Sequence, residues 1–344
     1  MSTLMARIEL QKLSAALELD ESRLAYLSDL DADELRDLRE MITGALYSHH
    51  ESRFGRMAAV SKLVPAAISA KASTLVGPAL SAQVAGALDT AHAVKLAKAM
   101  RPEFLAEVAT FIDPSRVAAI VKALPDSVVV PVGKTLLKRS NFLTLGRFTS
   151  VVAPETALKV TEDADGDELL QLALYTEDRP AIDAIVTKLE DFRIRLALAA
   201  AARSGNYDEA LALMEVLTPT NRARVIDEAI ALDDSERNDL MSGVISNDAW
   251  DMLIEAFDQV SHDALKAIVN VPATAEAAVI DVVLEQAIKA DRTEAFEAIL
   301  LALDAAHVTA MSASKVLKGA EFKAWVEKTP GLGDRLSGIL AKVS

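Results

Sequence analysis

Four basic side chains lie within a stretch of fourteen residues: Lys134, Lys138, Arg139 and Arg147. Lys134 and Lys138 are four positions apart and therefore share one face of a helix. Clusters of lysine and arginine bind phosphate groups, lipid headgroups and acidic partners. The alternative is a solvated surface whose charge balances the acidic C-terminal half. The chemistry that this stretch predicts is anion binding, not bond making or breaking.

Metal-binding patterns are incomplete in this sequence. The segment EDADGDE at residues 162–168 begins like a calcium-binding EF-hand loop, but Glu168 and Leu174 stand where that loop needs glycine and glutamate. We therefore predict a solvated turn there. The only histidine pair is His49-His50, and adjacent side chains on a helix point about 100° apart, so the two cannot readily bind one metal. We predict an exposed helix end at this pair and no metal site.

Motifs for catalysis are also missing. The chain has no cysteine, which excludes disulfides, thiolate metal ligands and cysteine nucleophiles. It contains no G-x-G-x-x-G, Walker or G-x-S-x-G motif, and Gly133-Lys134-Thr135 is the end of a phosphate-binding loop without its first glycine. We predict a protein that is not an enzyme and holds no cofactor, although a site assembled between repeats would leave no local motif.

A segment with almost no charge extends over residues 57–88, where Lys62 and Lys71 are the only charged side chains. A membrane span needs about 20 predominantly apolar residues, and these lysines, with breaks at Pro65 and Gly77-Pro78, argue against one. We predict a kinked helix followed by a short helix, both buried on most sides. The alternative is that part of the segment faces an apolar ligand, a membrane surface or another subunit, with the lysines near the polar end of such a ligand.

The elements that position these residues come from a twelve-residue repeat, which occurs five times between residues 86 and 145. Its best-formed units are apolar at positions 3, 8, 9, 11 and 12 and carry an aspartate or proline turn after position 3. The residues at position 3 are Leu88, Met100, Ile112, Leu124 and Leu136. Each unit is too short to be a stable helix alone. The repeat therefore predicts a solenoid in which stacked short helices bury their apolar faces together.

The turn and short helix in FIDPSRVAAIVKALPD, at residues 111–126 of this repeat region, resemble the helical N-terminal domain of MgtE-type magnesium transporters. The resemblance covers roughly residues 86–160. In that family the domain is a cytosolic sensor attached to a regulatory domain and a channel. The resemblance implies the fold of the middle of this chain. It implies neither transport nor any functional residue, because the sequence predicts no transmembrane segment.

Longer units follow from residue 154. Three similar segments begin at Ser204, Ser246 and Ala290, which are 42 and 44 residues apart. A period in the forties is typical of HEAT-like repeats, so we predict two helices in each. The predicted fold is all-α: a right-handed α-solenoid of twelve-residue units followed by HEAT-like helix pairs. The predicted domains are a helical cap over residues 1–56, a short-helix solenoid over 57–153, and HEAT-like repeats with a C-terminal cap over 154–344.

Charge is distributed unevenly. The formal net charge is −15, with 7 basic against 11 acidic residues in 1–56, 11 against 5 in 57–153, and 18 against 35 in 154–344. The acidic total argues against nucleic acid as a partner. The N-terminal residues lack the apolar core of a secretory signal, which favours a cytoplasmic location.

Two functions are compatible with these features. The first is a non-enzymatic scaffold that binds another protein or a second copy of itself, because opposite charges on neighbouring segments favour association. The second is a carrier or sensor of an apolar or amphipathic ligand such as a lipid or isoprenoid, or a protein that binds a membrane surface. The residues predicted to contact the ligand or partner are Lys62, Lys71, Lys134, Lys138, Arg139 and Arg147.

Overall fold

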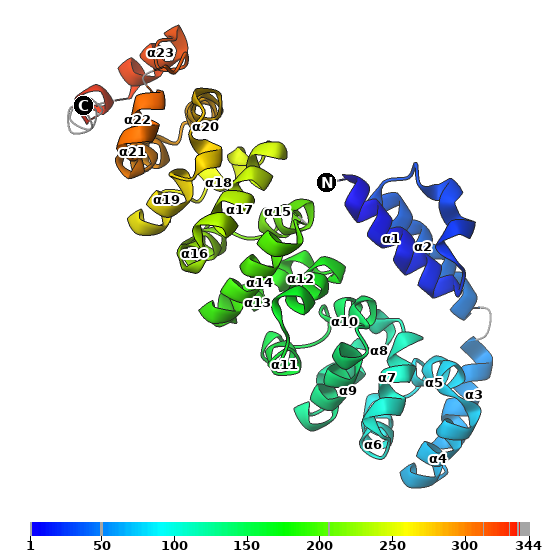
Figure 1. Ribbon diagram of the computed structural model, residues 1–344. Helices are drawn as coiled ribbons and strands as arrows, with labels where there is room; N and C mark the ends of the chain where they lie inside the picture. The colour runs from blue at the N-terminus through cyan, green and yellow to red at the C-terminus, as the bar shows by residue number, and fades with distance from the viewer. Residues whose placement is uncertain are drawn as a thin grey trace. The chain divides into compact units, whose positions relative to one another are not determined.

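The protein is a series of short helices (Figure 1). The computed structural model describes residues 2–48, 51–205, 207–311, 313–329, 331–335 and 337, and every regular element in these ranges is helical. The predicted all-α fold of stacked helices is confirmed. The chain divides into two compact units: unit 1 contains residues 1–164 and 171–188, and unit 2 contains residues 165–170 and 189–344. The division therefore lies further along the chain than the boundary predicted at residue 153.

The chain begins with a helical hairpin of α1 (Ser2–Leu17) and α2 (Ala32–Ser48), joined through the 3-10 helix η1 (Glu21–Leu27). Leu13 and Leu35 are fully buried between its helices. Asp31 accepts a hydrogen bond from the Glu34 backbone N–H at 2.8 Å, and Glu34 accepts one from the Asp31 N–H at 3.0 Å. This capping box satisfies two N–H groups that the helix itself leaves unpaired, and it fixes where α2 starts.

The solenoid of unit 1 follows the hairpin. Its helices are α3 (Glu51–Ser61), α4 (Ala66–Val76), α5 (Pro78–Ala85), α6 (Thr90–Lys98), α7 (Pro102–Thr110), α8 (Pro114–Ala123), α9 (Asp126–Lys138), α10 (Phe142–Phe148), α11 (Pro154–Val160), α12 (Gly166–Tyr175) and α13 (Arg179–Lys188). From α4 to α9, each helix starts twelve residues after the one before it. Proline at the first position needs no N–H partner, and Asp89 and Asp113 accept the free N–H groups of His92 and Ser115.

Most solenoid helices pack on the next helix but one. The pairs α4 with α6 and α6 with α8 form one row, while α5 with α7, α7 with α9, and α9 with α11 form the other. A helix of nine or ten residues therefore buries one face along its row and directs another toward the opposite row.

The segment over residues 57–88 differs from its prediction. Instead of a kinked helix and one short helix, it comprises the end of α3, α4 and α5. Gly77 separates α4 from α5 with a φ of 91°, a conformation that residues with a Cβ rarely adopt. The predicted burial is wrong at several apolar positions, because Leu63 and Leu75 are 84% and 88% exposed. α3 and α4 begin the two rows, so no earlier solenoid helix covers them.

Unit 2 contains α14 (Asp191–Ser204), α15 (Tyr207–Glu215), α16 (Pro219–Glu228), α17 (Asp234–Ser246), α18 (Trp250–Ile254), α19 (His262–Val269), α20 (Ala277–Lys289), α21 (Thr293–Ala302), α22 (Ala305–Met311) and α23 (Ala320–Lys328), with 3-10 turns η2 (Ala229–Ala231) and η3 (Pro272–Thr274). α14, α17 and α20 start 43 residues apart. Each such repeat contains three helices, one more than the predicted pair. The third helix begins after Thr218 or Ser261, whose hydroxyls accept N–H groups of its first turn.

A continuous apolar core runs through unit 2. Phe257 and Phe296 are fully buried in it, and the Phe296 ring packs edge-to-face on Trp325 with 5.2 Å between ring centroids. The predicted C-terminal helix at residues 329–344 lies largely outside the described residues. So do His49 and His50.

Candidate functional site: an apolar cavity in unit 1

A cavity of about 590 Å³ lies between the two rows of unit 1. Small-molecule sites in proteins typically measure about 300–1,000 Å³, so this volume suits a ligand of lipid or drug size. Helices from α3 to α12 contribute to its wall, and most of the contributing side chains are Ala, Val, Leu, Ile or Met. A pocket among the described residues of unit 2, next to Trp250 and Leu284, measures only about 30 Å³.

The cavity wall follows the twelve-residue repeat over a longer range than residues 86–145, where the sequence analysis identified the repeat. Every twelfth residue over 64–172 lines the cavity: Val64, Val76, Leu88, Met100, Ile112, Leu124, Leu136, Phe148, Val160 and Leu172. Five of these ten positions were identified in the sequence, and the remaining five extend the same register on both sides of 86–145. The repeat therefore includes the uncharged segment as well as α10 to α12.

Positions 8, 11 and 12 of the repeat line the cavity together with position 3 of the following unit. In α6 and the turn after it these residues are Ala93, Leu96, Ala97 and Met100. Their spacing is i, i+3, i+4 and i+7, which is one face of a helix. Residues at position 9 do not face the cavity. Ala106, at this position, is fully buried but does not line the cavity. Alanine, serine and glycine are frequent at positions 8 and 12, so the facing rows leave a space unfilled.

The cavity opens beside α3 and α4. The lining residues that are exposed to solvent all come from these two helices: Arg56, Met57, Val60, Ala72 and Val76. Val60 is 61% exposed and Val76 50%. At the opposite end no described lining residue is fully exposed: Leu136 and Val160 are only 3% and 6% exposed, and Phe148 and Leu172 are half-buried. A ligand would therefore enter at α3 and α4 and extend toward α9 and α11.

Polar groups in the wall are mostly occupied by the backbone. The Ser73 hydroxyl donates to the Ser69 carbonyl oxygen at 2.9 Å, and the Ser81 hydroxyl donates to the Gly77 carbonyl oxygen at 2.8 Å. Such hydroxyls offer little to a ligand because their protons are already donated. Among the described lining residues Arg56 is the one charged side chain, and it lies at the mouth. The sequence prediction missed Arg56 because it was assigned to the N-terminal cap.

The predicted basic cluster does not form a single site. Lys134 lies 3.3 Å from Glu162 and 2.8 Å from Asp163, and the hydrogen bond with Asp163 raises its pKa. Arg139 lies 3.5 Å from Glu107. Lys138 is exposed at the end of α9, the helix that also contains Lys134. The solvated, charge-balanced alternative describes these three residues better than a shared anion site does.

Lys62 and Lys71 lie on the exposed side of the cavity mouth. Lys62 forms an ion pair of 2.9 Å with Asp89, the residue that caps α6. Lys71 is exposed on α4. Neither side chain lines the cavity.

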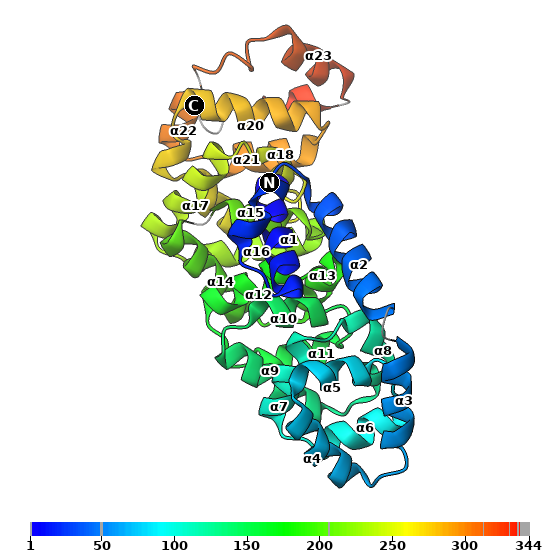
Figure 2. The same ribbon diagram turned by 90° about the vertical axis from the view of Figure 1, so that its right-hand side faces the viewer.

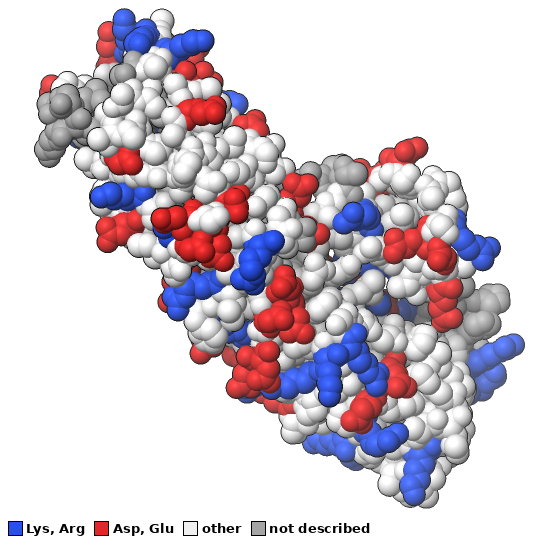
Figure 3. Space-filling view, viewed as in Figure 1, with Lys and Arg blue, Asp and Glu red and all other residues white. Residues whose placement is uncertain are grey.

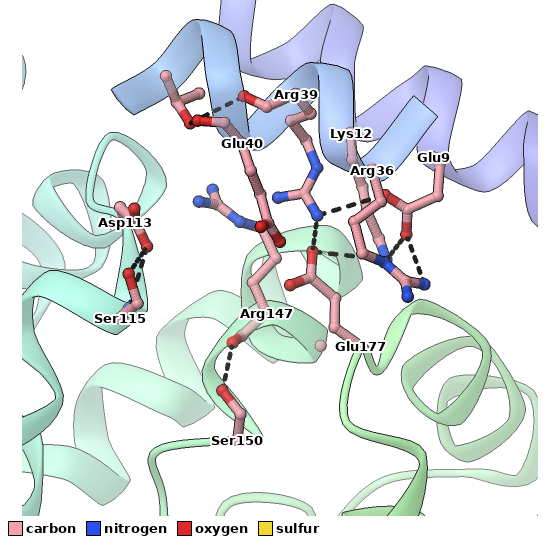
Figure 4. A network of polar contacts seen from close by, with 12 residues as sticks. Glu9, Lys12, Arg36, Arg39, Glu40, Asp113, Ser115, Arg147, Ser150 and Glu177 are labelled. Carbon is pink, nitrogen blue, oxygen red and sulfur yellow. Dashed lines mark hydrogen bonds and ion pairs between the residues drawn. The ribbon is translucent and has the colours of Figure 1, made fainter. Parts of the chain in front are cut away.

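Arg147 belongs to a different and largely buried group of charges (Figure 4). Arg39 lies 3.3 Å from Glu9 and 3.1 Å from Glu177, and Lys12 lies 2.9 Å from Glu9 and 3.5 Å from Glu177. Burial lowers the pKa of Arg147, which lies near this group. Burial raises the pKa of Glu9, but the charges of Lys12 and Arg39 outweigh it and the net shift is downward.

These charges attach the N-terminal hairpin to the side of the solenoid. The Tyr175 hydroxyl donates to the Gln11 side-chain oxygen at 2.7 Å, next to the Glu177 contacts. Both ribbon views place α1 and α2 beside α10 and α12 (Figure 2). The hairpin therefore does not extend the stack before α3, as a terminal cap would, and the first solenoid helices stay exposed.

The described parts of the chain offer little support for metal binding or for a membrane span. No group of three or more His, Asp or Glu side chains is placed to hold a metal ion in these ranges. The EF-hand-like segment is a turn, as predicted, in which Asp165 and Glu168 cap the start of α12 through reciprocal backbone hydrogen bonds. None of the described helices is both long enough and apolar enough to span a membrane.

Comparison of the chain with protein-family models, curated proteins and solved structures gives no match. The resemblance of residues 86–160 to the MgtE-type domain therefore stays a prediction about the fold of this region.

Proposed function

We propose that unit 1 binds a molecule with an apolar chain, such as a fatty acyl or isoprenoid group, and acts as its carrier or sensor. The observation that supports this proposal best is the cavity of about 590 Å³ with an almost wholly apolar wall. Filling such a space with a hydrocarbon contributes about 0.8 kcal/mol per buried methylene. Ten successive repeat units supply apolar side chains to it, which fits a site built by the repeat better than an accidental packing defect.

The polar end of the ligand would lie at the mouth. Arg56 is exposed and lines the cavity there, and a guanidinium group binds a carboxylate or phosphate through paired hydrogen bonds. The ligand class that fits is therefore an anionic amphiphile with its chain inside the cavity. Arg56 therefore takes the headgroup-binding role that the sequence assigned to Lys134, Lys138, Arg139 and Arg147. Lys134 and Arg139 are paired with acidic residues, and Arg147 is buried elsewhere.

A binding scaffold, which the sequence favoured first, is the less specific proposal. A stack of helices suits many functions, and the scaffold hypothesis gives no reason for an open apolar cavity. For a carrier or sensor of this kind we propose a cytoplasmic location, with neither nucleic acid nor a cofactor as partner.

The test uses two substitutions on α6 that add the same ring. Ala97 lines the cavity, whereas Ala91 is exposed on the outside of the helix. Ala97→Phe would displace about four methylenes of a bound chain, which at about 0.8 kcal/mol each lowers affinity on the order of 100-fold. Ala91→Phe should leave affinity unchanged. Affinity is measured by displacement of a fluorescent fatty acid, and native mass spectrometry of the purified protein identifies any bound lipid.

The headgroup is tested separately. Arg56→Gln should weaken binding of a fatty acid about tenfold and leave a neutral fatty alcohol unaffected, with Arg53→Gln as the control on the same helix. The proposal is wrong if the wild-type protein binds neither probe and carries no lipid, or if both phenylalanine variants bind like the wild type.

A further inference from the structure

The surface around the cavity mouth exposes more large apolar side chains than any other described part of the chain. We call this surface the docking face; it consists of Met57, Val60, Leu63, Ile68, Leu75 and Val76. Leu63 and Leu75 are 84% and 88% exposed, and all six residues belong to α3, α4 or the turn between them. Contiguous exposed apolar surface of this kind usually marks a binding surface.

The charges around the docking face are mostly positive, although Lys62 is paired with Asp89. Arg53, Arg56, Lys62 and Lys71 are exposed, and the sequence contains no Asp or Glu between Glu51 and Asp89. Figure 3 shows Lys and Arg gathered over the end of unit 1 that α3, α4 and α6 form. The net charge of −15 is carried by other segments, and a Debye length of about 8 Å at physiological salt screens distant acidic residues.

The docking face is continuous with the cavity. Met57, Val60 and Val76 belong to the face and also line the mouth. Whatever covers this face therefore also covers the entrance, and an apolar ligand could pass into the cavity without crossing water.

We propose that the docking face binds the surface of an anionic lipid bilayer, with Leu63 and Leu75 inserted among the lipids and the basic side chains against the headgroups. Apolar residues at the interface, combined with basic residues beside them, are the combination that anchors peripheral proteins. The bilayer would then be both the anchor and the source or destination of the ligand. This last step rests on the proposed function, whereas attachment to the bilayer does not.

A second copy of the chain fits the docking face less well. In a twofold dimer through this face, Arg53, Arg56 and Lys71 of one copy would approach the same cations of the other. Such like-charge contacts oppose association. An anionic membrane is attracted by the same residues.

The experiment is co-sedimentation of the full chain with vesicles of phosphatidylcholine, pure or with about 30 mol% phosphatidylserine. Wild-type protein should bind the anionic vesicles and lose most of this binding at about 0.5 M salt. Leu63→Ser and Leu75→Ser should each lower the partition coefficient about tenfold. The control is Leu301→Ser, because Leu301 is also exposed (51%) but lies on α21 of unit 2.

The charge component has its own matched pair. Lys71→Gln should lower binding to anionic vesicles about fivefold and leave the weak binding to pure phosphatidylcholine unchanged. Lys266→Gln, on the exposed surface of α19, removes the same charge from unit 2 and should change neither. Circular dichroism of each variant establishes that it is folded.

The outcomes separate the two proposals. Ala97→Phe should lower ligand affinity on the order of 100-fold and retain vesicle binding. Leu63→Ser and Leu75→Ser should weaken vesicle binding about tenfold each and retain ligand binding. Absence of vesicle binding by the wild type, with ligand binding intact, overturns the docking proposal and leaves the proposed function standing. A concentration-dependent dimer that Leu63→Ser and Leu75→Ser abolish, in protein that ignores vesicles, also overturns it and assigns the face to self-association.

Discussion

Gly146 allows the backbone of α10 to approach the end of α12, and replacing it tests the packing that positions the buried charges. A Cβ at residue 146 would overlap the carbonyl of Tyr175 and lie 2.8 Å from the backbone nitrogen of Thr176. The next residue, Glu177, donates its N–H to the Gly146 carbonyl oxygen at 3.4 Å and contacts Arg39. Gly44 on α2 is the matched control, because nothing lies within 4 Å of a Cβ added there.

The magnitudes follow from these surroundings. In both helices alanine is favoured over glycine by about 0.5–1 kcal/mol. At Gly146 the overlap is with backbone atoms, which cannot rotate away, so the overpacking cost lies at the upper end of the usual range of about 1–3 kcal/mol. Gly146→Ala should therefore destabilise unit 1 by about 2 kcal/mol. Gly44→Ala should stabilise the same unit by about 0.5–1 kcal/mol.

Differential scanning calorimetry measures both effects, with circular dichroism as the second probe. For a unit of this size 1 kcal/mol corresponds to about 2–4 °C, so Gly146→Ala should lower the Tm of unit 1 by about 4–8 °C and Gly44→Ala should raise it by about 1–4 °C. Since the two units need not unfold together, the transition that responds to both variants is that of unit 1. If Gly146→Ala proved as stable as the wild type, the close approach of α10 to Tyr175 would be wrong.

Two further predictions concern buried or capped carboxylates. The lowered pKa of Glu9 means that its ionised form stabilises the fold above its unfolded pKa and that this contribution is lost as pH falls through the folded value. Unit 1 should therefore lose stability between about pH 5 and pH 2, and Glu9→Gln should flatten that part of a pH series of urea unfolding curves while lowering stability at pH 7. In unit 2 the Asp281 carboxylate accepts hydrogen bonds from the Ser314 hydroxyl and from the N–H groups of Lys315 and Val316. Asp281→Ala should destabilise unit 2 by about 2–3 kcal/mol, because the proton of the fully buried Ser314 hydroxyl and two backbone N–H groups lose their acceptor. An unchanged unit 2 transition would contradict the hydrogen bonding.

The helical repeat could be predicted from the sequence because its signals are local. Asp89, Pro102 and Pro114 each determine a helix start through their own backbone or side chain. The extension of the register to Val64 was missed although Pro78 starts α5 in the same register as Pro102 and Pro114. Toward Leu172 no proline recurs at this position of the repeat. The signal that could have found it is the apolar residue at every twelfth position, which needs no turn.

The arrangement of charges could not be predicted in the same way. The spacing of Lys134 and Lys138 gives their shared helix but not the acidic residues that another helix brings to them. Glu162 and Asp163 lie 28 and 29 residues further along the chain and reach Lys134 only through the packing of the solenoid. The same reason explains Arg147, whose neighbours Glu9 and Arg39 come from the hairpin. Ion pairing is set by tertiary structure, so local spacing can suggest an anion site that neighbouring helices have already neutralised.

Side-chain volume, not hydrophobic pattern, distinguishes the two units. Both present apolar residues along one face of each short helix, but unit 2 fills its interior with large side chains such as Trp250, Phe257 and Phe296. Between residues 57 and 164 the chain has four phenylalanines and no other aromatic residue, and only Phe148 of these lines the cavity. With alanine, serine and glycine at the closest approaches, facing rows cannot meet, and the space that remains is too large to be a packing defect of an ordinary core. The repeat keeps an apolar face over ten units but lacks the side-chain volume that would fill the space between the two rows. A binding cavity requires this combination, and we therefore propose that unit 1 functions through its interior.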